Sequence, residues 1–524
     1  MKKYTKYNTK YKKTKKRKTV SKTKYPKFKQ KTKKNIKKLN PSNIIKVMII
    51  LGFIFILLGL KLSFTEFKKK FKNYYRHYAK YEKEFNRSST CDSLDPINIF
   101  NKRLKNDPIE LCKEKNTNHI CYINPQGYYN KIFANKGGVL CTMENIVLDP
   151  SKLKQTNLVY NGPVVQQHNG FPRLSKGFFN TKCAHNKIKF HYNNYMYGDY
   201  FHSWDYNYNI ENENEKLEEL APGKTILLIS RNDASPNLFH GNSEIINVIS
   251  ILYLFNLAPE EVQIIIYDGI QLAEDPFYEI YKNMLSRGGE LIYARNLKKK
   301  YKISKAINVP INWDSPPFIY IDIPKCNLAT RTYKLYNDLI DKYMALKPFK
   351  DKFISDNITY YYPYITIKNY ENEIKFKKKV TIQWRKVWPK KRKGQTRLLS
   401  NATLLADKLA KKLPNDILVR LIDTATLSYK DQISLMRNTD YLIGIHGAGL
   451  SLCIFLPKTA ILHEMCKSKK NNLLTTMSAL SGHKTYSDLL PFQSYSKNGN
   501  EYIRFNEESF IKRVLDKMKE NNFF

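Results

Sequence analysis

The sequence lacks the signatures of several common protein classes. Its eight cysteines include no CxxC pair, and no group of cysteines and histidines has the spacing of a zinc site. It contains no RNP, KH or zinc-finger motif, so its positive charge supports only non-specific contact with nucleic acid. Acidic residues are absent before Glu66. These absences argue against a metal site and against specific binding of nucleic acid.

The first forty residues are basic and have almost no aliphatic side chains. They contain 19 lysines and arginines, and the whole chain has 90 basic against 46 acidic residues. A segment of this composition cannot bury enough apolar surface to offset the entropy that it would lose on ordering. We therefore expect residues 1–43 to form a disordered basic tail.

One apolar run is long enough to cross a membrane. Residues 44–64 read IIKVMIILGFIFILLGLKLSF, and these 21 residues would span about 30 Å as a helix. A cleaved signal peptide fits less well, because the preceding segment is too long and no small-residue cleavage site follows. Residues 44–64 are therefore predicted to be a signal-anchor, with the basic tail in the cytosol and the remaining chain in the lumen.

The positions of the cysteines and sequons are consistent with a lumenal location of the chain after the predicted anchor. All eight cysteines follow the predicted anchor, and their even number is compatible with disulfides whose pairing the sequence does not give. Asn86, Asn357 and Asn401 begin Asn-x-Ser/Thr sequons and are the predicted N-glycosylation sites.

The lumenal part alternates between strand-like and helix-like segments. Residues 65–139 are predicted to be a stem and a first lumenal segment. The alternation within 140–350, and again within 351–524, predicts two α/β halves, each a Rossmann-type domain with parallel strands and crossover helices. The predicted strands are 225–230, 262–268, 290–297, 378–384, 416–423, 440–445 and 460–465, and the predicted helices are 244–257, 275–286, 331–348, 400–413, 428–438 and 506–519.

The segment HGAGL starts at His446, at the carboxyl end of a predicted strand, where ligands of parallel sheets bind. Gly447 and Gly449 permit positive φ and expose backbone N–H groups, and a helix starting near Ala448 would attract a diphosphate. His446 can donate to a phosphate or a sugar hydroxyl, and Glu464 can accept from ribose hydroxyls. The alternative is a tight turn without a ligand.

Two residue pairs flank this segment. His463 and Glu464 are neighbours in a predicted strand, so they are expected to point to opposite faces, and only one of them should meet a ligand. Cys453 and Cys466 are compatible with two buried thiols or with a bridge.

The region around HGAGL resembles the signature of glycosyltransferase family 61, whose members transfer xylose or N-acetylglucosamine (GlcNAc). The shared pattern is a Lys-x-Gln helix, a strand ending in HGAGL, an apolar helix, a Pro-containing turn and a strand ending in Glu. Upstream, SPNLFHGNSEIIN resembles the family's Asn-x-aromatic-His segment, although Glu244 stands where the family usually has Asp. The matching residues are Lys430, Gln432, His446, Gly447, Ala448, Gly449, Leu450, Phe455, Pro457 and Glu464 in the signature, and Asn237, Phe239, His240, Arg385, Arg397 and Asn401 elsewhere.

The resemblance implies a GT-B-like pair of facing Rossmann-type domains and an inverting transferase. The expected partners are a UDP-sugar donor (UDP-GlcNAc or UDP-xylose), a glycan or glycoprotein acceptor, and the membrane of the Golgi or endoplasmic reticulum. A homodimer is also compatible with the sequence. Because Asp-x-Asp occurs nowhere in the chain, the carboxylate pair that holds a metal in GT-A enzymes is missing. No metal or cofactor is therefore expected.

Donor binding and proton removal need different residues. The predicted donor site combines Arg385, Arg397, His446, Gly447, Ala448, Gly449, Leu450 and Glu464, with the two arginines on the diphosphate or uracil side. The candidate bases are Glu244, Asp268 at the end of a strand, and His240 one helical turn before Glu244. A cap or packing role is the alternative for His240. A non-catalytic lumenal sugar-binding or scaffold protein is the alternative to an enzyme.

Overall fold

The computed structural model describes residues 91–105, 108–114, 117–123, 139–154, 173–183, 198–208, 217–231, 237–268, 276–287, 289–310, 326, 328–349, 358–361, 376–385, 397–466, 473–497 and 500–524. All of these residues belong to one compact unit, Tyr74–Phe524. None of the helices in these ranges has the length and apolar character that crossing a bilayer requires. The tail at 1–43 and the signal-anchor at 44–64 lie outside the described residues and stay predictions.

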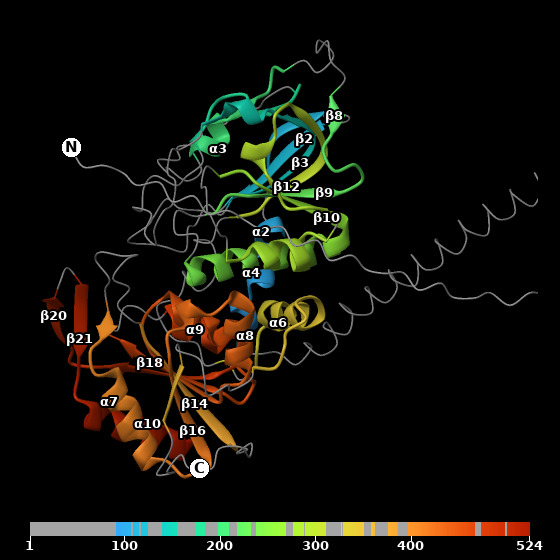
Figure 1. Ribbon diagram of the computed structural model, residues 1–524. Helices are drawn as coiled ribbons and strands as arrows, with labels where there is room; N and C mark the ends of the chain where they lie inside the picture. Colours follow the sequence, from blue (N-terminus) through green and yellow to red (C-terminus); the bar gives the residue numbers. More distant parts are fainter. Residues whose placement is uncertain are drawn as a thin grey trace, which may run out of the picture. The chain divides into compact units, whose positions relative to one another are not determined.

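The first sheet has ten strands and includes a parallel, Rossmann-type part. Its strands are β1 (Ile109–Glu114), β2 (Thr117–Ile123), β3 (Val139–Leu148), β6 (Phe179–Asn180), β7 (Trp204–Asp205), β8 (Glu218–Glu219), β9 (Thr225–Ile229), β10 (Val262–Ile266), β11 (Ile292–Tyr293) and β12 (Tyr301–Asn308). The parallel strands lie in the order β11-β10-β9-β12, which is the 3-2-1-4 order of half a Rossmann fold (Figure 1). β3, β2 and β1 extend the sheet beyond β12 as antiparallel strands.

The helices of this half are α2 (Pro96–Lys105), α3 (Gly198–His202), α4 (Leu238–Leu254), α5 (Tyr278–Ile280) and α6 (Arg331–Tyr343). α4 begins well before the predicted start at residue 244. Asn237 caps it, because its side-chain oxygen accepts a hydrogen bond from the Phe239 N–H at 3.0 Å. The helix predicted at 275–286 is shorter, since α5 continues into a single π-helical turn at Tyr281–Leu285.

The range 65–139, predicted to contain a stem and a first lumenal segment, is partly folded. α2, β1 and β2 fall inside this range, and β1 and β2 belong to the first sheet. The described residues from 91 onward are therefore part of the folded body.

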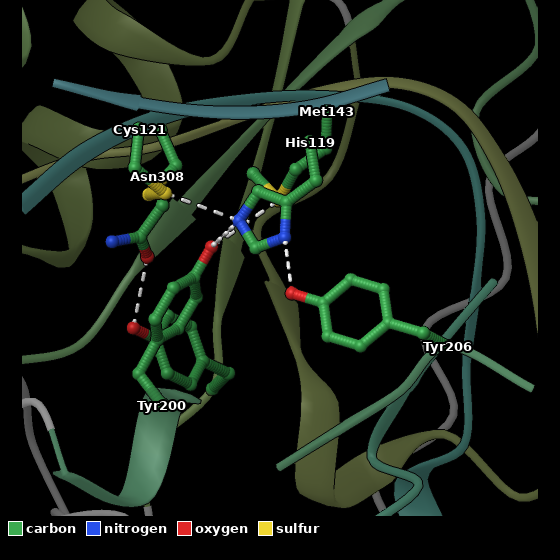
Figure 2. Close-up of a disulfide and its surroundings, with 8 residues drawn as sticks. His119, Cys121, Met143, Tyr200, Tyr206 and Asn308 are labelled. Atoms are coloured by element: carbon green, nitrogen blue, oxygen red, sulfur yellow. Dashed lines mark hydrogen bonds between the residues drawn. A yellow bond between two sulfur atoms is a disulfide. The ribbon is translucent and has the colours of Figure 1, made fainter. Parts of the chain in front are cut away.

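Three disulfides join segments of this half: Cys91–Cys326, Cys112–Cys183 and Cys121–Cys141. The last of them lies beside the buried side chain of His119 (Figure 2). Nδ1 of His119 lies 2.9 Å from the Tyr206 hydroxyl, and Nε2 lies 3.2 Å from the Tyr200 hydroxyl. Disulfides of this kind are typical of proteins that fold in an oxidising compartment.

The second sheet has six strands, of which five are parallel. They are β13 (Ile358–Tyr361), β14 (Lys378–Gln383), β16 (Ile417–Ile422), β17 (Tyr441–Ile445), β18 (Ile461–Cys466) and β19 (Lys484–Leu489). The parallel strands lie in the order β16-β14-β17-β18-β19, which is 2-1-3-4-5 along the chain, and β13 is an antiparallel edge. Figure 1 labels β14, β16 and β18 of this sheet. The order reverses between β14 and β17.

The described helical segments of the second half are α7 (Ala402–Lys412), the short 3₁₀ helix η9 (Thr424–Thr426), α8 (Tyr429–Arg437), the 3₁₀ helix η10 (Ala448–Phe455), α9 (Leu473–Leu480) and α10 (Glu507–Glu520). Ser428 caps α8 as the sequence predicts, because its hydroxyl oxygen accepts from the Asp431 N–H at 3.2 Å. A small separate sheet contains β15 (Leu398–Leu399), β20 (Gln493–Lys497) and β21 (Asn500–Arg504), and β4 (Leu153–Lys154) pairs with β5 (Arg173–Leu174).

The two halves share one apolar core. A single cluster of buried side chains runs from Leu227 on β9, through α4 and η10, to Leu442 on β17. The predicted pair of α/β halves is thus observed, with a packed layer between them. The GT-B arrangement around an open cleft stays a prediction.

Candidate functional site

The HGAGL segment lies at the reversal point of the second sheet. β17 ends at Ile445, and its parallel neighbour β14 ends at Gln383, paired with Gly444. Side chains that follow these two strands therefore emerge at the same edge of the sheet. Ligands of open α/β sheets bind at such a reversal point, outside the carboxyl ends of the strands.

The glycines of this segment are explained by close packing. Gly447 has φ 171°, which is extended backbone, and the described glycines with positive φ are Gly177, Gly223 and Gly482. The positive φ that Gly447 and Gly449 permit is therefore not adopted at either residue. A Cβ at residue 447 would lie 2.7 Å from Nη2 of Arg385, and a Cβ at residue 449 would overlap the side-chain amide of Gln383.

Two arginines converge on the segment. Arg385 lies against Gly447 from the end of β14. Nη1 of Arg397 donates to the backbone oxygen of His446 at 2.8 Å, and Arg397 itself has φ 61°, a left-handed conformation that costs a non-glycine residue free energy. The sheet edge thus combines two guanidinium groups with the start of η10, which suits an anion.

His446 is held by Glu464. Its Nδ1 lies 2.6 Å from Oε1 of Glu464, whose side chain is fully buried, whereas the His446 side chain is 17% exposed. If Nδ1 donates to the carboxylate, Nε2 is the ring nitrogen that remains for a ligand. Glu464, predicted to contact a ribose, therefore lies behind His446 and orients it.

The neighbouring residue belongs to a different network. Nδ1 of His463 lies 2.7 Å from the Tyr441 hydroxyl, and Nε2 lies 3.0 Å from Asp488, which also pairs with Arg513. His463 and Glu464 thus have separate partners on opposite faces of β18, as the sequence predicts.

The three candidate bases come from the first half of the chain. Asp268 follows β10 and forms a buried, bidentate ion pair with Arg231, with N···O distances of 2.7 and 2.8 Å. His240 and Glu244 lie one turn apart in α4, and Glu244 is 4% exposed. The geometry gives Asp268 a structural ion pair, so it favours the two α4 residues, and all three assignments stay predictions.

The sequon at Asn401 is not compatible with a glycan in this fold. Asn401 is 8% exposed, and its side-chain nitrogen donates to the backbone oxygen of Phe505 at 3.1 Å and to Glu507. The prediction at Asn401 is corrected for this reason. Asn86 and Asn357 lie outside the described residues.

A buried polar cluster behind η10 was not predicted. Nδ2 of Asn242 donates to the Ser451 hydroxyl at 3.2 Å, and its Oδ1 accepts from Tyr336 at 3.0 Å and Tyr429 at 2.6 Å. These residues come from α4, η10, α6 and α8. The cluster joins the two halves and fixes η10, but no spacing in the sequence connects its members.

The two remaining cysteines are free and buried. Of the two alternatives, buried thiols or a bridge, the structure therefore has the thiols. Burial, and next the charge of Glu464, raise the pKa of the Cys466 thiol to about 12. Cys466 lies on β18, two residues after Glu464.

These features define a Rossmann-type α/β protein with a candidate site for an anionic ligand at the reversal point of its second sheet. Residues 291–462 match the sequence model of the family described as Glycosyltransferase 61. This match confirms the resemblance to glycosyltransferase family 61 that the HGAGL region predicts. The match includes Arg385, Arg397 and HGAGL and ends just before Glu464.

One curated relative is similar over a shorter stretch. A segment of 98 residues is 32% identical to a Drosophila melanogaster protein named "EGF domain-specific O-linked N-acetylglucosamine transferase". The segment covers 18% of this chain and 19% of the relative, so the chain matches about a fifth of the relative's length.

Proposed function

We propose that the protein is an inverting glycosyltransferase that binds a UDP-sugar at the HGAGL segment. One observation carries the proposal: Arg385, Arg397 and the start of η10 meet at the reversal point of the second sheet. Guanidinium groups and unpaired backbone N–H groups suit the oxygens of a diphosphate. His446, held by Glu464, faces the same edge.

The transfer breaks the bond between the anomeric carbon and a diphosphate oxygen. The acceptor hydroxyl attacks this carbon from the opposite face, which inverts its configuration, and UDP leaves with the electron pair. The proton of the hydroxyl passes to a base. The two arginines stabilise the negative charge that develops on the diphosphate, so the reaction needs no metal in this proposal.

Of the three candidate bases, Asp268 is the one that the contacts disfavour. Both carboxylate oxygens of Asp268 already accept from Arg231, and Arg231 N–H donates to the same carboxylate. Losing this carboxylate's charge during proton transfer would leave a buried guanidinium without its counter-charge. Glu244 and His240 lie on one face of α4, in the half that would bind the acceptor.

The name of the relative supports UDP-GlcNAc over UDP-xylose as the donor. A glycoprotein of the secretory pathway is the corresponding acceptor. The three disulfides support a lumenal body. With the predicted signal-anchor at 44–64, the protein would be a single-pass type II protein of the Golgi or endoplasmic reticulum membrane, alone or as a homodimer.

The test is a panel of nucleotide sugars with the full-length protein in detergent. UDP-GlcNAc should be hydrolysed slowly without an acceptor and faster with one, in the presence of a chelator. Arg385→Ala should lose most of this turnover, whereas Arg504→Ala, which changes an exposed arginine on β21, should keep it. If no nucleotide sugar is turned over or bound by the folded protein, the proposal is wrong and a non-catalytic sugar-binding protein is the better description.

A further inference from the structure

Three metal-ligating side chains converge behind the HGAGL segment. A ring nitrogen of His446, a carboxylate oxygen of Glu464 and Sγ of Cys466 all lie within 4.8 Å of one another. Glu464 and Cys466 are two residues apart on β18, so their side chains lie on the same face. His446 follows the neighbouring parallel strand β17 and completes the group.

One atom of this group lacks a partner. Oε1 of Glu464 contacts His446, but Oε2 is buried and has no hydrogen-bond partner in the described part of the chain. A buried carboxylate oxygen without a partner is unfavourable, and a cation would satisfy it. Cys466 is also buried, and its sulfur accepts from the Ser487 hydroxyl at 3.2 Å.

We propose that His446, Glu464 and Cys466 form a Zn²⁺ site that inhibits donor binding. An imidazole nitrogen, a carboxylate oxygen and a thiolate are the ligand types that Zn²⁺ prefers, and a water molecule completes the tetrahedron. Ligand atoms around tetrahedral Zn²⁺ lie roughly 3.4 Å apart, so the shorter His446–Glu464 contact opens when the ion enters. The ion replaces the proton between these two residues and the proton of the thiol.

Inhibition follows from the shared residues and rests on the proposed function. His446 and Glu464 belong to the proposed donor site, in which Nε2 of His446 meets the donor. An ion between Nδ1 and Glu464 opens the 2.6 Å contact and pushes the ring away from Glu464, so Nε2 leaves the position in which it meets the donor. A bound donor, in turn, fixes His446 in the position that excludes the ion. Zn²⁺ and the nucleotide sugar therefore compete.

A second cluster of metal-ligating residues shows why metal binding requires the free thiol of Cys466. His119, Cys121 and Cys141 are equally close to one another, but the two sulfurs are joined in a disulfide (Figure 2). A disulfide sulfur is not a thiolate ligand. Cys466 is a free thiol, and so is Cys453, which lies outside both clusters.

Co²⁺ is the probe for the proposed site, because a cobalt–thiolate bond gives a charge-transfer absorption band. When Co²⁺ is added to the metal-free full-length protein, this band should appear and should saturate at about one equivalent of Co²⁺. Adding Zn²⁺ should then abolish it. Cys466→Ser should lose the band, and Cys453→Ser, the matched control, should keep it. Glu464→Gln should retain the band but weaken Co²⁺ binding at least about tenfold, since one ligand is lost.

Each outcome bears on one part of the inference. Absence of a band in the folded wild-type protein, or its persistence in Cys466→Ser, overturns the metal site. UDP should weaken Co²⁺ binding about tenfold or more if His446 is shared. If UDP binds but does not affect the band, the metal ion and the nucleotide do not compete, and the proposed inhibition is wrong. If UDP does not bind at all while the band is present, the proposed function fails and the metal site stands.

Discussion

Arg385 lies against Gly447 so closely that a Cβ at residue 447 would lie 2.7 Å from its Nη2 atom. Gly447→Ala should therefore displace the guanidinium from the HGAGL segment. We expect the affinity for UDP to fall about tenfold, equivalent to about 1.4 kcal/mol, with the thermal unfolding midpoint nearly unchanged. Titration calorimetry with UDP measures this directly.

The control for this prediction is the same substitution in an Arg385→Ala background. If Gly447 serves only to make room for Arg385, Gly447→Ala should have no further effect there. Equal losses in both backgrounds would mean that the glycine acts independently of the arginine.

The side chain of Arg397 should stabilise the fold, although its backbone conformation is unfavourable for a non-glycine residue. Arg397→Ala removes the charged hydrogen bond to the His446 carbonyl, which should lower the free energy of unfolding by about 1.5–3 kcal/mol. Arg397→Gly removes the same bond but relieves the left-handed backbone, so it should be more stable than the alanine variant by about 1 kcal/mol. Urea unfolding of the two variants checks this order, and an alanine variant as stable as the glycine one contradicts it.

The Asn242 cluster should stabilise the contact between the two halves. Asn242→Ala leaves the hydroxyls of Tyr336, Tyr429 and Ser451 without this partner, at a cost of about 1–3 kcal/mol for each buried group. Tyr429→Phe is the milder control, because Asn242 keeps its other contacts, and should cost about 1 kcal/mol. Similar unfolding midpoints for the two variants would show that the cluster is not cooperative.

Stability should fall in mild acid because of His483. Burial, and next the charge of Arg437, lower the pKa of His483 to about 4, and neither ring nitrogen has a hydrogen-bond partner among the described residues. Between the ordinary pKa of about 6.5 and this value, the unfolded chain binds a proton that the folded chain does not. The folded state therefore loses about 2 kcal/mol from this residue between about pH 8 and about pH 5.

The measurement is the urea midpoint of the wild-type protein and of His483→Gln at these two pH values. Glutamine does not titrate, so the variant should lose less stability on acidification. An identical pH dependence in both proteins would show that His483 is not the responsible group.

The sequence predicts best the strands that are buried on both faces. TILLI, VQIII and YLIGI are continuous apolar runs, and they match β9, β10 and β17 to within about two residues. β12 was missed because its sequence, YKISKAIN, mixes lysines with apolar residues and is only partly covered in its first half. The order of the strands depends on contacts between distant segments, which no local pattern contains.

The position of the candidate site could be predicted, but the reason for its glycines could not. A strand ending in HGAGL indicates a turn at the carboxyl edge of a sheet. Whether a glycine is needed for its φ or for the space that it leaves depends on Arg385 and Gln383, which lie far away in the sequence. In the same way, Asn401 matches a sequon but is buried by the backbone near Phe505.

The disulfide between Cys91 and Cys326 spans 235 residues of the chain. At a synthesis rate of about 5–20 residues per second, Cys91 waits roughly 10–50 s for its partner to leave the ribosome. Cys112, Cys121, Cys141 and Cys183 all emerge during this interval, so the first partners that Cys91 meets are incorrect ones. We therefore predict that an oxidant without a disulfide isomerase traps part of the newly made protein in non-native disulfides of Cys91.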